Sequence, residues 1–132
     1  MGRALRYLLD THAILWWWIN SPRLSAAMSR LIRDNRADVV VSAVCGWEIA
    51  TKQRLKKLPE LDQTVAEFLP YCADEGFDVL PISPAHALRG GSYPQSHGDP
   101  FDRVLAAQAE LDGFVLVTKD EAFDDFPCMT RW

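Results

Sequence analysis

The chain has 132 residues and a mass of 14.9 kDa, so we expect residues 1–132 to form a single globular domain. Hydrophobic residues make up 48% of the sequence and charged residues 24%, which excludes a disordered or collagen-like chain. The longest apolar run, residues 13–19, is too short to cross a bilayer, and the first residues lack the apolar stretch of a signal peptide. We therefore expect a cytoplasmic protein with no membrane partner.

The cysteines and the net charge limit the kinds of metal site and ligand that we expect. Cys45, Cys72 and Cys128 are widely spaced and form no CxxC pair, which argues against a disulfide framework and against a zinc site. Fourteen Lys and Arg residues against eighteen Asp and Glu residues give a net charge of -4. A nucleic acid is therefore not attracted by the overall field, and a polyanionic substrate requires a local source of positive charge.

Apolar runs, capping residues and turn residues predict the order of the elements. Strands are expected at residues 5–9, 39–41, 77–82 and 114–118, with a last short strand at 128–132. Helices are expected at residues 12–19, 25–35, 42–58, 62–75 and 100–112, with a short helix that begins at Pro84. Residues 90–98 are expected to form a polar, glycine-rich loop. Strands that alternate with helices and are buried on both faces predict an α/β fold: a mostly parallel sheet of about five strands between two helical layers.

Acidic residues gather at one edge of this predicted sheet. Asp10 directly follows the first strand, and Asp120 follows the fourth after one lysine. Glu48 lies on the helix after the second strand, and Asp99 and Asp102 begin the helix that leads to the fourth strand. Because ligands of such sheets bind beyond the carboxyl ends of the strands, we expect these carboxylates to converge in one cleft.

A cluster of carboxylates repels itself unless its pKa values rise or a cation binds. Oxygen ligands favour Mg²⁺ or Mn²⁺ over zinc, and the histidines at positions 12, 86 and 97 show no metal-ligand spacing. A bound cation also supplies the positive charge that a net acidic chain lacks for binding a phosphodiester. The residues alone therefore favour a magnesium or manganese site.

Each acid also has a purely structural explanation. Asp99 is as readily a helix N-cap, and Asp102 complements the dipole of the same helix. Glu48 and Lys52 are spaced i,i+4, as in a solvated salt bridge. Asp10 is the hardest to explain this way, because a strand end followed by Thr-His-Ala needs no acid for folding. The position of all of them at one sheet edge favours a functional site.

Four segments resemble the PIN domain in their order and spacing. They are residues 8–16 (LLDTHAILW), 41–52 (VSAVCGWEIATK), 97–109 (HGDPFDRVLAAQA) and 116–120 (LVTKD). Within that family they are similar to the VapC-type toxins of bacterial toxin–antitoxin pairs. The resemblance covers most of the chain and implies an α/β/α fold, a metal-dependent ribonuclease and a cognate antitoxin as partner.

The same resemblance implies roles for individual residues. The family's acidic quartet, which holds Mg²⁺ or Mn²⁺ and performs catalysis, is matched by Asp10, Glu48, Asp102 and Asp120. Asp99 belongs to the same motif as Asp102 and is expected to add to the metal site, while Glu121 is an alternative to Asp120. The RNA substrate is expected to contact Thr11, Lys52, Arg103 and Thr118.

Two further groups of residues are candidate binding surfaces. The basic residues after Glu48 are Lys52, Arg54, Lys56 and Lys57. They form either a solvated helix end or, beside the cleft, a contact for the RNA backbone. Three consecutive tryptophans, residues 16–18, point about 100° apart on a helix and cannot all face the core. We expect at least one exposed tryptophan at a homodimer or antitoxin interface, the alternative being two in the core and one under a loop.

Other protein classes share part of this pattern. A phosphoacceptor receiver domain has a similar length, but it needs a second acid beside Asp10 and a phosphorylated Asp where this chain places Glu48 inside a helix. A haloacid-dehalogenase-like phosphatase needs an Asp where this chain has His12. A PIN-like module that binds RNA or protein without cutting, and a PIN nuclease that processes RNA without a toxin role, stay open.

Overall fold

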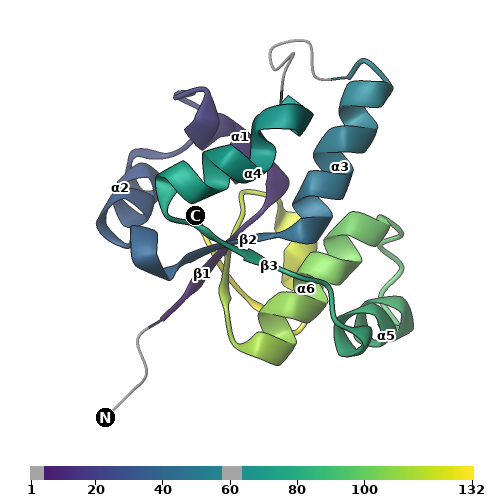
Figure 1. Ribbon diagram of the computed structural model, residues 1–132. Coiled ribbons are helices and arrows are strands. Elements are labelled where there is room, and N and C mark those ends of the chain that lie inside the picture. Colours follow the sequence, from purple (N-terminus) through teal and green to yellow (C-terminus); the bar gives the residue numbers. More distant parts are fainter. Residues whose placement is uncertain (1–4, 58–63) are drawn as a thin grey trace.

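The computed structural model describes residues 5–57 and 64–132 (Figure 1). Over these residues the strands are β1 (Tyr7–Leu9), β2 (Val39–Ser42), β3 (Asp78–Leu80), β4 (Val115–Val117) and β5 (Met129–Arg131). The α-helices are α1 (Thr11–Trp18), α2 (Ala26–Asp34), α3 (Ala43–Arg54), α4 (Thr64–Glu75), α5 (Pro84–Ser92) and α6 (Pro100–Asp112). Two short 3-10 helices are η1 (Arg36–Asp38) and η2 (Glu121–Asp125). Residues 58–63, where one helix was expected to end and the next to begin, lie outside the described residues.

The sheet is parallel throughout, in the order β3-β2-β1-β4-β5. Its register places Leu8 of β1 between Val40 of β2 and Leu116 of β4. The chain first builds outward from β1 to β3 and then returns to add β4 on the other side of β1. The strand order therefore reverses between β1 and β4, where ligands bind in open α/β sheets. A receiver domain has the order 2-1-3-4-5, so the receiver hypothesis is wrong.

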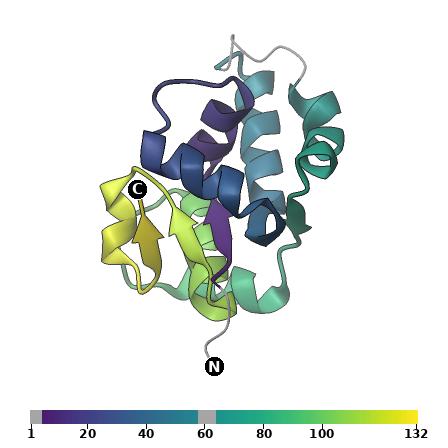
Figure 2. The same ribbon diagram turned by 90° about the vertical axis from the view of Figure 1, so that its left-hand side faces the viewer.

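Helices cover both faces of the sheet and confirm the predicted three-layer α/β/α architecture. Figures 1 and 2 show α1 to α4 on one face and α5 and α6 on the other. The central strands β1, β2 and β4 are fully buried, whereas β3 and β5 leave side chains exposed at the two edges. The prediction that every strand is buried on both faces is therefore wrong for β3 and β5, which lie at the two edges of the sheet. No helix among the described residues combines the length and apolarity that a bilayer crossing needs.

The predicted glycine-rich loop begins later than expected, because α5 extends to Ser92. Gly90 is buried in this helix, where an added Cβ would come within 3.0 Å of the backbone oxygen of Arg103. The glycine therefore allows α5 and α6 to pack closely rather than opening a loop. Helix α6 follows the sequence prediction, since Asp99 and Pro100 begin it and Gly113, at φ 74°, ends it in the left-handed conformation.

The three tryptophans of α1 are all half-buried, so the expectation of an exposed one is wrong. Each finds its own aromatic or polar partner at the edge of the core. Trp16 packs edge-on against Trp132, Trp18 stacks on Tyr71 at 4.0 Å between ring centroids, and Trp17 donates a hydrogen bond to Glu75. The three side chains thus pack on different sides of α1 and not along one apolar stripe. The 100° spacing alone does not reveal which partners they find.

Candidate active site

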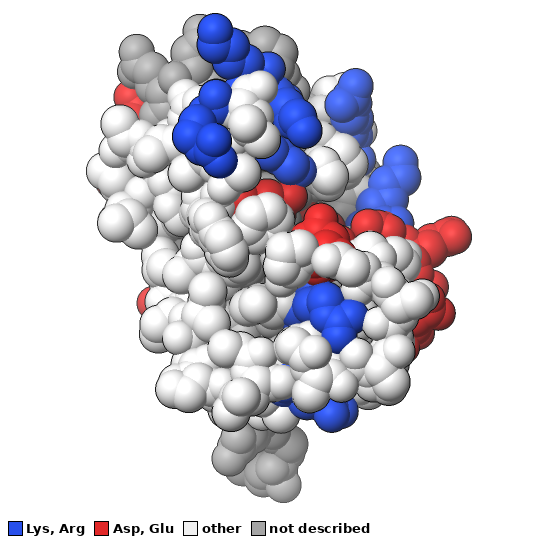
Figure 3. Space-filling model, turned by 90° about the vertical axis from the view of Figure 1, so that its right-hand side faces the viewer, with Lys and Arg blue, Asp and Glu red and all other residues white. Residues whose placement is uncertain are grey.

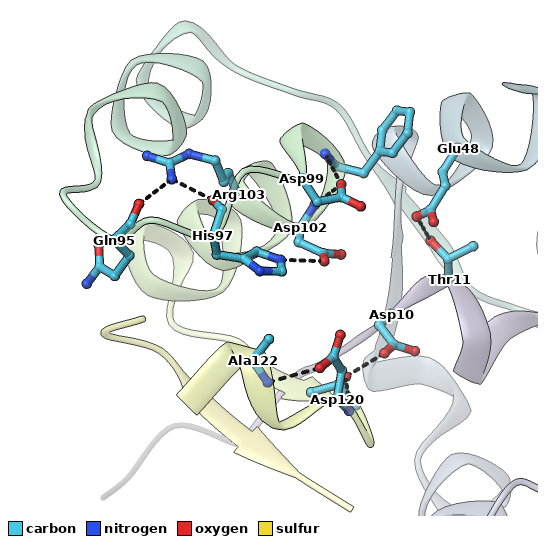
Figure 4. A network of polar contacts seen from close by, with 12 residues as sticks. Asp10, Thr11, Glu48, Gln95, His97, Asp99, Asp102, Arg103, Asp120 and Ala122 are labelled. Atoms are coloured by element: carbon cyan, nitrogen blue, oxygen red, sulfur yellow. Dashed lines mark hydrogen bonds and ion pairs between the residues drawn. The ribbon is translucent and has the colours of Figure 1, made fainter. Parts of the chain in front are cut away.

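The carboxyl ends of the strands meet at a pocket beside the point where the strand order reverses. Figure 4 shows the carboxylates of Asp10, Asp99, Asp102 and Asp120 around a common space, with Glu48 beside Thr11. The residues that line this pocket, called the acid pocket below, are Asp10, Thr11, His12, Glu48, Lys52, Asp99, Asp102, Asp120 and Phe123. The structure thus brings together the acids that the sequence placed at one sheet edge; their catalytic and metal-binding roles stay predictions.

Asp10 lies at the end of β1 and is tied to the sheet and to α1. Its backbone N–H donates to the carbonyl of Val117 at 3.1 Å. Its Oδ1 accepts from the N–H of Ala13 at 2.7 Å, and its Oδ2 accepts from the hydroxyl of Thr118. Asp10 is 6% exposed, and this burial raises the pKa of its carboxyl group above the usual range. Asp10 is also the N-cap of α1, a structural role that the sequence analysis did not assign to it.

Glu48 reaches the acid pocket from α3. Ser42 caps this helix by accepting from the N–H of Val44 at 3.0 Å, so α3 begins directly at the sheet edge. Glu48 is buried, its Oε1 accepts from the hydroxyl of Thr11, and its Oε2 lies 2.6 Å from Nζ of Lys52. The pair of Glu48 and Lys52 therefore forms inside the pocket and is not the solvated salt bridge that its spacing alone explains.

Helix α6 contributes two acids through its first turn. Asp99 is the N-cap, and its Oδ1 accepts from the N–H groups of Phe101 at 2.8 Å and Asp102 at 3.2 Å. The Oδ2 of Asp102 lies 2.8 Å from Nε2 of His97. Burial raises the pKa of Asp102 to about 6, with Asp99 and Glu48 adding to the rise and the hydrogen bond of His97 opposing it. Both the capping explanation and the pocket location therefore hold for Asp99.

The loop before α6 is held by Arg103. The guanidinium group donates hydrogen bonds to the backbone carbonyls of Gly90, Tyr93, Gln95 and His97. Figure 4 shows Arg103 on the opposite side of His97 from the carboxylates. The expected substrate contact of Arg103 stays a prediction, while these bonds fix the segment that presents His97 to Asp102. The sequence analysis considered His97 only as a metal ligand and found no such spacing, although its place five residues before Asp102 was the available signal.

The segment after β4 completes the pocket. Thr118 is buried, and its Oγ1 donates to Asp10 while accepting from the N–H of Asp120 at 3.1 Å. Asp120 is the N-cap of η2, with Oδ1 accepting from the N–H of Ala122 at 2.9 Å. Asp120 lines the acid pocket, whereas Glu121 lines the neighbouring hollow. The geometry therefore favours Asp120 over Glu121 as the fourth acid.

Residues 7–127 match the PIN domain family. The chain belongs to this family. Ribonuclease VapC22 of Mycobacterium tuberculosis is 34% identical over 114 residues, which cover 86% of this chain and 85% of that protein. The solved structure of DNA-bound VapBC from Salmonella typhimurium has the same fold, with a TM-score of 0.69 and 16% identity over 97% of this chain and 98% of that chain. FitAcB from Neisseria gonorrhoeae shares it too, with a TM-score of 0.66 and 23% identity over 94% and 95%.

Membership of the PIN domain family confirms the resemblance of the four sequence segments and overturns the dehalogenase alternative. The family implies a divalent metal, and the carboxylates of this PIN domain fit Mg²⁺ or Mn²⁺ in their chemistry, because every acid in the pocket offers oxygen ligands. A bound cation also offsets the penalty that burial imposes on Asp10 and Asp102. In their present orientations, no three His, Cys, Asp or Glu side chains among residues 5–57 and 64–132 are grouped closely enough to hold one ion.

Positive charge lies next to the acids of this PIN domain. Figure 3 shows Lys and Arg side chains gathered at one end of a molecular face, with Asp and Glu side chains below them. Lys52 lines the acid pocket, and Arg54, Lys56 and Lys57 follow it as exposed residues. The basic end of α3 is therefore adjacent to the cleft, as one of the two sequence interpretations required.

Proposed function

We propose that this chain is a Mg²⁺- or Mn²⁺-dependent endoribonuclease that hydrolyses phosphodiester bonds of RNA in the acid pocket. One observation carries the proposal: Asp10, Glu48, Asp102 and Asp120 come from four separate segments and line a single pocket where the strand order reverses. The likeness to Ribonuclease VapC22 over most of both chains supports the same activity.

The four acids, with Asp99 beside them, would hold the cation. When bound, the cation activates a water molecule and neutralises charge on the phosphate. The hydroxyls of Thr118 and Thr11 hold Asp10 and Glu48 in place before any ligand arrives. Lys52 pairs with Glu48 and His97 contacts Asp102, and both contacts lessen the repulsion among the carboxylates of the pocket. With a cation bound, the carboxylates of Glu48 and Asp102 would serve as oxygen ligands from their places in the lining of the pocket.

The RNA strand enters along the basic end of α3. Lys52 lines the acid pocket beside Glu48, so its ammonium group is placed to contact a phosphate there. The exposed charges of Arg54, Lys56 and Lys57 continue this path outward. Such contacts recognise the phosphate backbone and not the base sequence. We place Arg103 outside this path, as a positioning residue for His97.

The biological role that fits best is the toxin of a toxin–antitoxin pair, with a cognate antitoxin as partner. The relative named VapC22 and the fold of the VapBC and FitAcB structures support this role. We also propose a homodimer and a cytoplasmic location, where an RNA substrate would be available. Large apolar side chains exposed on three different helices, Trp47, Leu69 and Leu88, offer surface for these partners.

A cleavage assay tests the nuclease proposal. End-labelled structured and unstructured RNAs are incubated with the wild-type protein, with Asp10→Asn and with the matched control Asp74→Asn, an exposed acid of α4. We expect cleavage by the wild type and the control in Mg²⁺ or Mn²⁺, none in EDTA, and none by Asp10→Asn. A wild-type protein that binds Mn²⁺ by calorimetry but cuts no RNA contradicts the proposal and favours a binding module.

The toxin role is tested separately in cells. Induced expression of the wild type is expected to stop growth, whereas Asp10→Asn leaves growth unchanged. Co-expression of the protein encoded next to this gene is expected to restore growth if it is the antitoxin. Cleavage in the test tube without any effect on growth supports the alternative of an RNA-processing PIN nuclease.

A further inference from the structure

A second hollow adjoins the acid pocket and is lined partly by aromatic rings. We call this space the aromatic hollow. It is lined by His12, Trp16, Lys119, Asp120 and Glu121. His12 and Asp120 also line the acid pocket, so the two spaces lie next to each other and share these two side chains. Helix α1 supplies the two rings, and the segment after β4 supplies the other side.

The rings of the aromatic hollow are held in a fixed arrangement. His12 stacks on Trp16 with 5.5 Å between ring centroids and 28° between the ring planes. Trp132 packs edge-on against Trp16 at 5.8 Å from the other end of the described chain. His12 is exposed and Trp16 is half-buried, so the stack forms part of the surface. A preformed and partly exposed stack of rings is suited to a flat aromatic ligand.

The charges of the aromatic hollow decide which part of a nucleotide fits it. Its lining includes one positively charged side chain, Lys119, and two carboxylates, those of Asp120 and Glu121. The adjoining groove along β5 adds Arg131 but also Asp124, so the balance stays acidic. A phosphate is repelled by such a balance, whereas an uncharged base is not. The basic end of α3, in contrast, lines the acid pocket through Lys52 and suits phosphates.

We propose that the aromatic hollow binds one nucleobase of the RNA, at a nucleotide next to the bond that is cut. The proposal rests on the proposed nuclease function of the acid pocket. The base stacks on the surface formed by His12 and Trp16, while its phosphate lies over the acid pocket and the strand continues toward Lys52. His12 and Trp16 are positioning residues, and they fix which phosphodiester bond reaches the carboxylates.

An RNA with a missing base tests this placement. A short single-stranded RNA that the wild type cuts at one mapped position is resynthesised with a base-free ribose at each nucleotide flanking that position, one at a time. The rate ratio of intact to base-free RNA is measured for the wild type, Trp16→Leu and His12→Ala. Trp18→Leu is the matched control, because Trp18 stacks on Tyr71 on another side of the same helix. Each ratio compares two RNAs with the same protein preparation. A fraction of unfolded protein therefore lowers both rates equally and leaves the ratio unchanged.

We expect one flanking position at which base removal slows the wild type and Trp18→Leu by about 10-fold or more, the size of a lost stacking contact. Trp16→Leu and His12→Ala should show little further loss at that position. An equal penalty in the wild type and in Trp16→Leu, or no penalty at any flanking position, overturns the proposal.

A binding measurement separates this proposal from the nuclease proposal. The same RNAs are titrated by fluorescence anisotropy in Ca²⁺, which occupies oxygen sites with looser geometry than Mg²⁺. Tighter binding of intact than base-free RNA by the wild type, lost in Trp16→Leu, supports the base site even if no RNA is cut. Equal binding of both RNAs by the wild type refutes the base site even if the nuclease is active.

Discussion

The inner acids and the outer acids of the pocket are held in different ways. The inner acids, Asp10 and Glu48, are each 6% exposed, and each accepts a hydrogen bond from a buried threonine, Asp10 from Thr118 directly after β4 and Glu48 from Thr11 of α1. The outer acids, Asp99, Asp102 and Asp120, are partly or fully exposed and cap helices or contact the loop before α6. The inner acids are therefore set by the fold itself, whereas the position of Asp102 depends on a loop.

The inner and outer acids therefore have different roles in the proposed function. Under the proposed function, the inner acids are the fixed part of the cation site, because buried threonines on α1 and directly after β4 hold them. Under the same proposal, the outer acids are the part that adjusts to a cation and a phosphate, because they are more exposed. Burial raises the pKa of both Asp10 and Asp102, so ionised carboxylates here carry a cost that a bound cation would offset.

The largest expected effect comes from neutralising an inner acid. Glu48→Gln keeps the size of the side chain but removes the charge beside Asp10. We expect cleavage to fall by more than about 100-fold, because groups that merely support metal ligands already cost about 10- to 100-fold when changed. Single-turnover cleavage in Mg²⁺ measures the effect, with Glu67→Gln on the exposed face of α4 as the control. A loss below about 10-fold would place Glu48 outside the metal site.

The second test weakens the loop before α6, which carries His97, the partner of the outer acid Asp102. Arg103→Lys replaces a planar group that reaches four carbonyls with a single ammonium group. We expect the free energy of unfolding to fall by about 2 to 3 kcal/mol, because buried carbonyls lose their donors. Urea unfolding measures this change, and Arg89→Lys, which alters a half-exposed pair with Glu110, is the control. Equal stability of both variants would mean that the loop does not depend on Arg103.

The sequence predicted that the acids meet at one sheet edge better than it predicted the partners of each acid, for a physical reason. Asp10 and Glu48 follow strands β1 and β2, whose short apolar runs and capping residues fix where the chain leaves the sheet. The partner of Asp102 depends on the path of the loop before α6, which Arg103 fixes through backbone carbonyls that carry no sequence signal. The contact between His97 and Asp102 was therefore not foreseen.

The same limit explains the other features that the sequence did not predict correctly. Gly90 looked like a loop residue because glycine permits a turn, and only the close approach of α6 shows its actual purpose. The tryptophans of α1 looked partly exposed because their spacing excludes a single buried stripe. Their partners, such as Trp132 and Tyr71, come from distant parts of the chain. Strand order likewise follows from which strands pair, and local patterns do not specify pairing.

A smaller effect is expected from the hydroxyl that joins the inner and outer acids. Thr118→Val keeps the shape but removes the donor to Asp10 and the acceptor for the N–H of Asp120. We expect cleavage to fall about 10-fold, with a weaker apparent affinity for Mg²⁺, as for other residues that orient metal ligands. Metal titrations of the cleavage rate measure both quantities, and Thr130→Val on β5 is the control. An unchanged Mg²⁺ dependence would show that Asp10 keeps its position without this hydroxyl.

The smallest effect is a change of stability with pH in the absence of metal. The pKa of Asp102 is about 6 in the folded protein and 3.8 in an unperturbed chain, so the folded state binds the proton more tightly. The stabilisation from this proton is complete below pH 3.8 and is lost as the pH rises through about 6. In EDTA at pH 7, Asp102→Asn should therefore be more stable than the wild type by about 1 to 2 kcal/mol, with a flatter dependence on pH. Urea unfolding across this pH range measures both, with Asp74→Asn as the control. A variant that is less stable than the wild type at pH 7 would mean that the bond between His97 and ionised Asp102 outweighs the cost of burial, and that the outer acids are as firmly set as the inner ones.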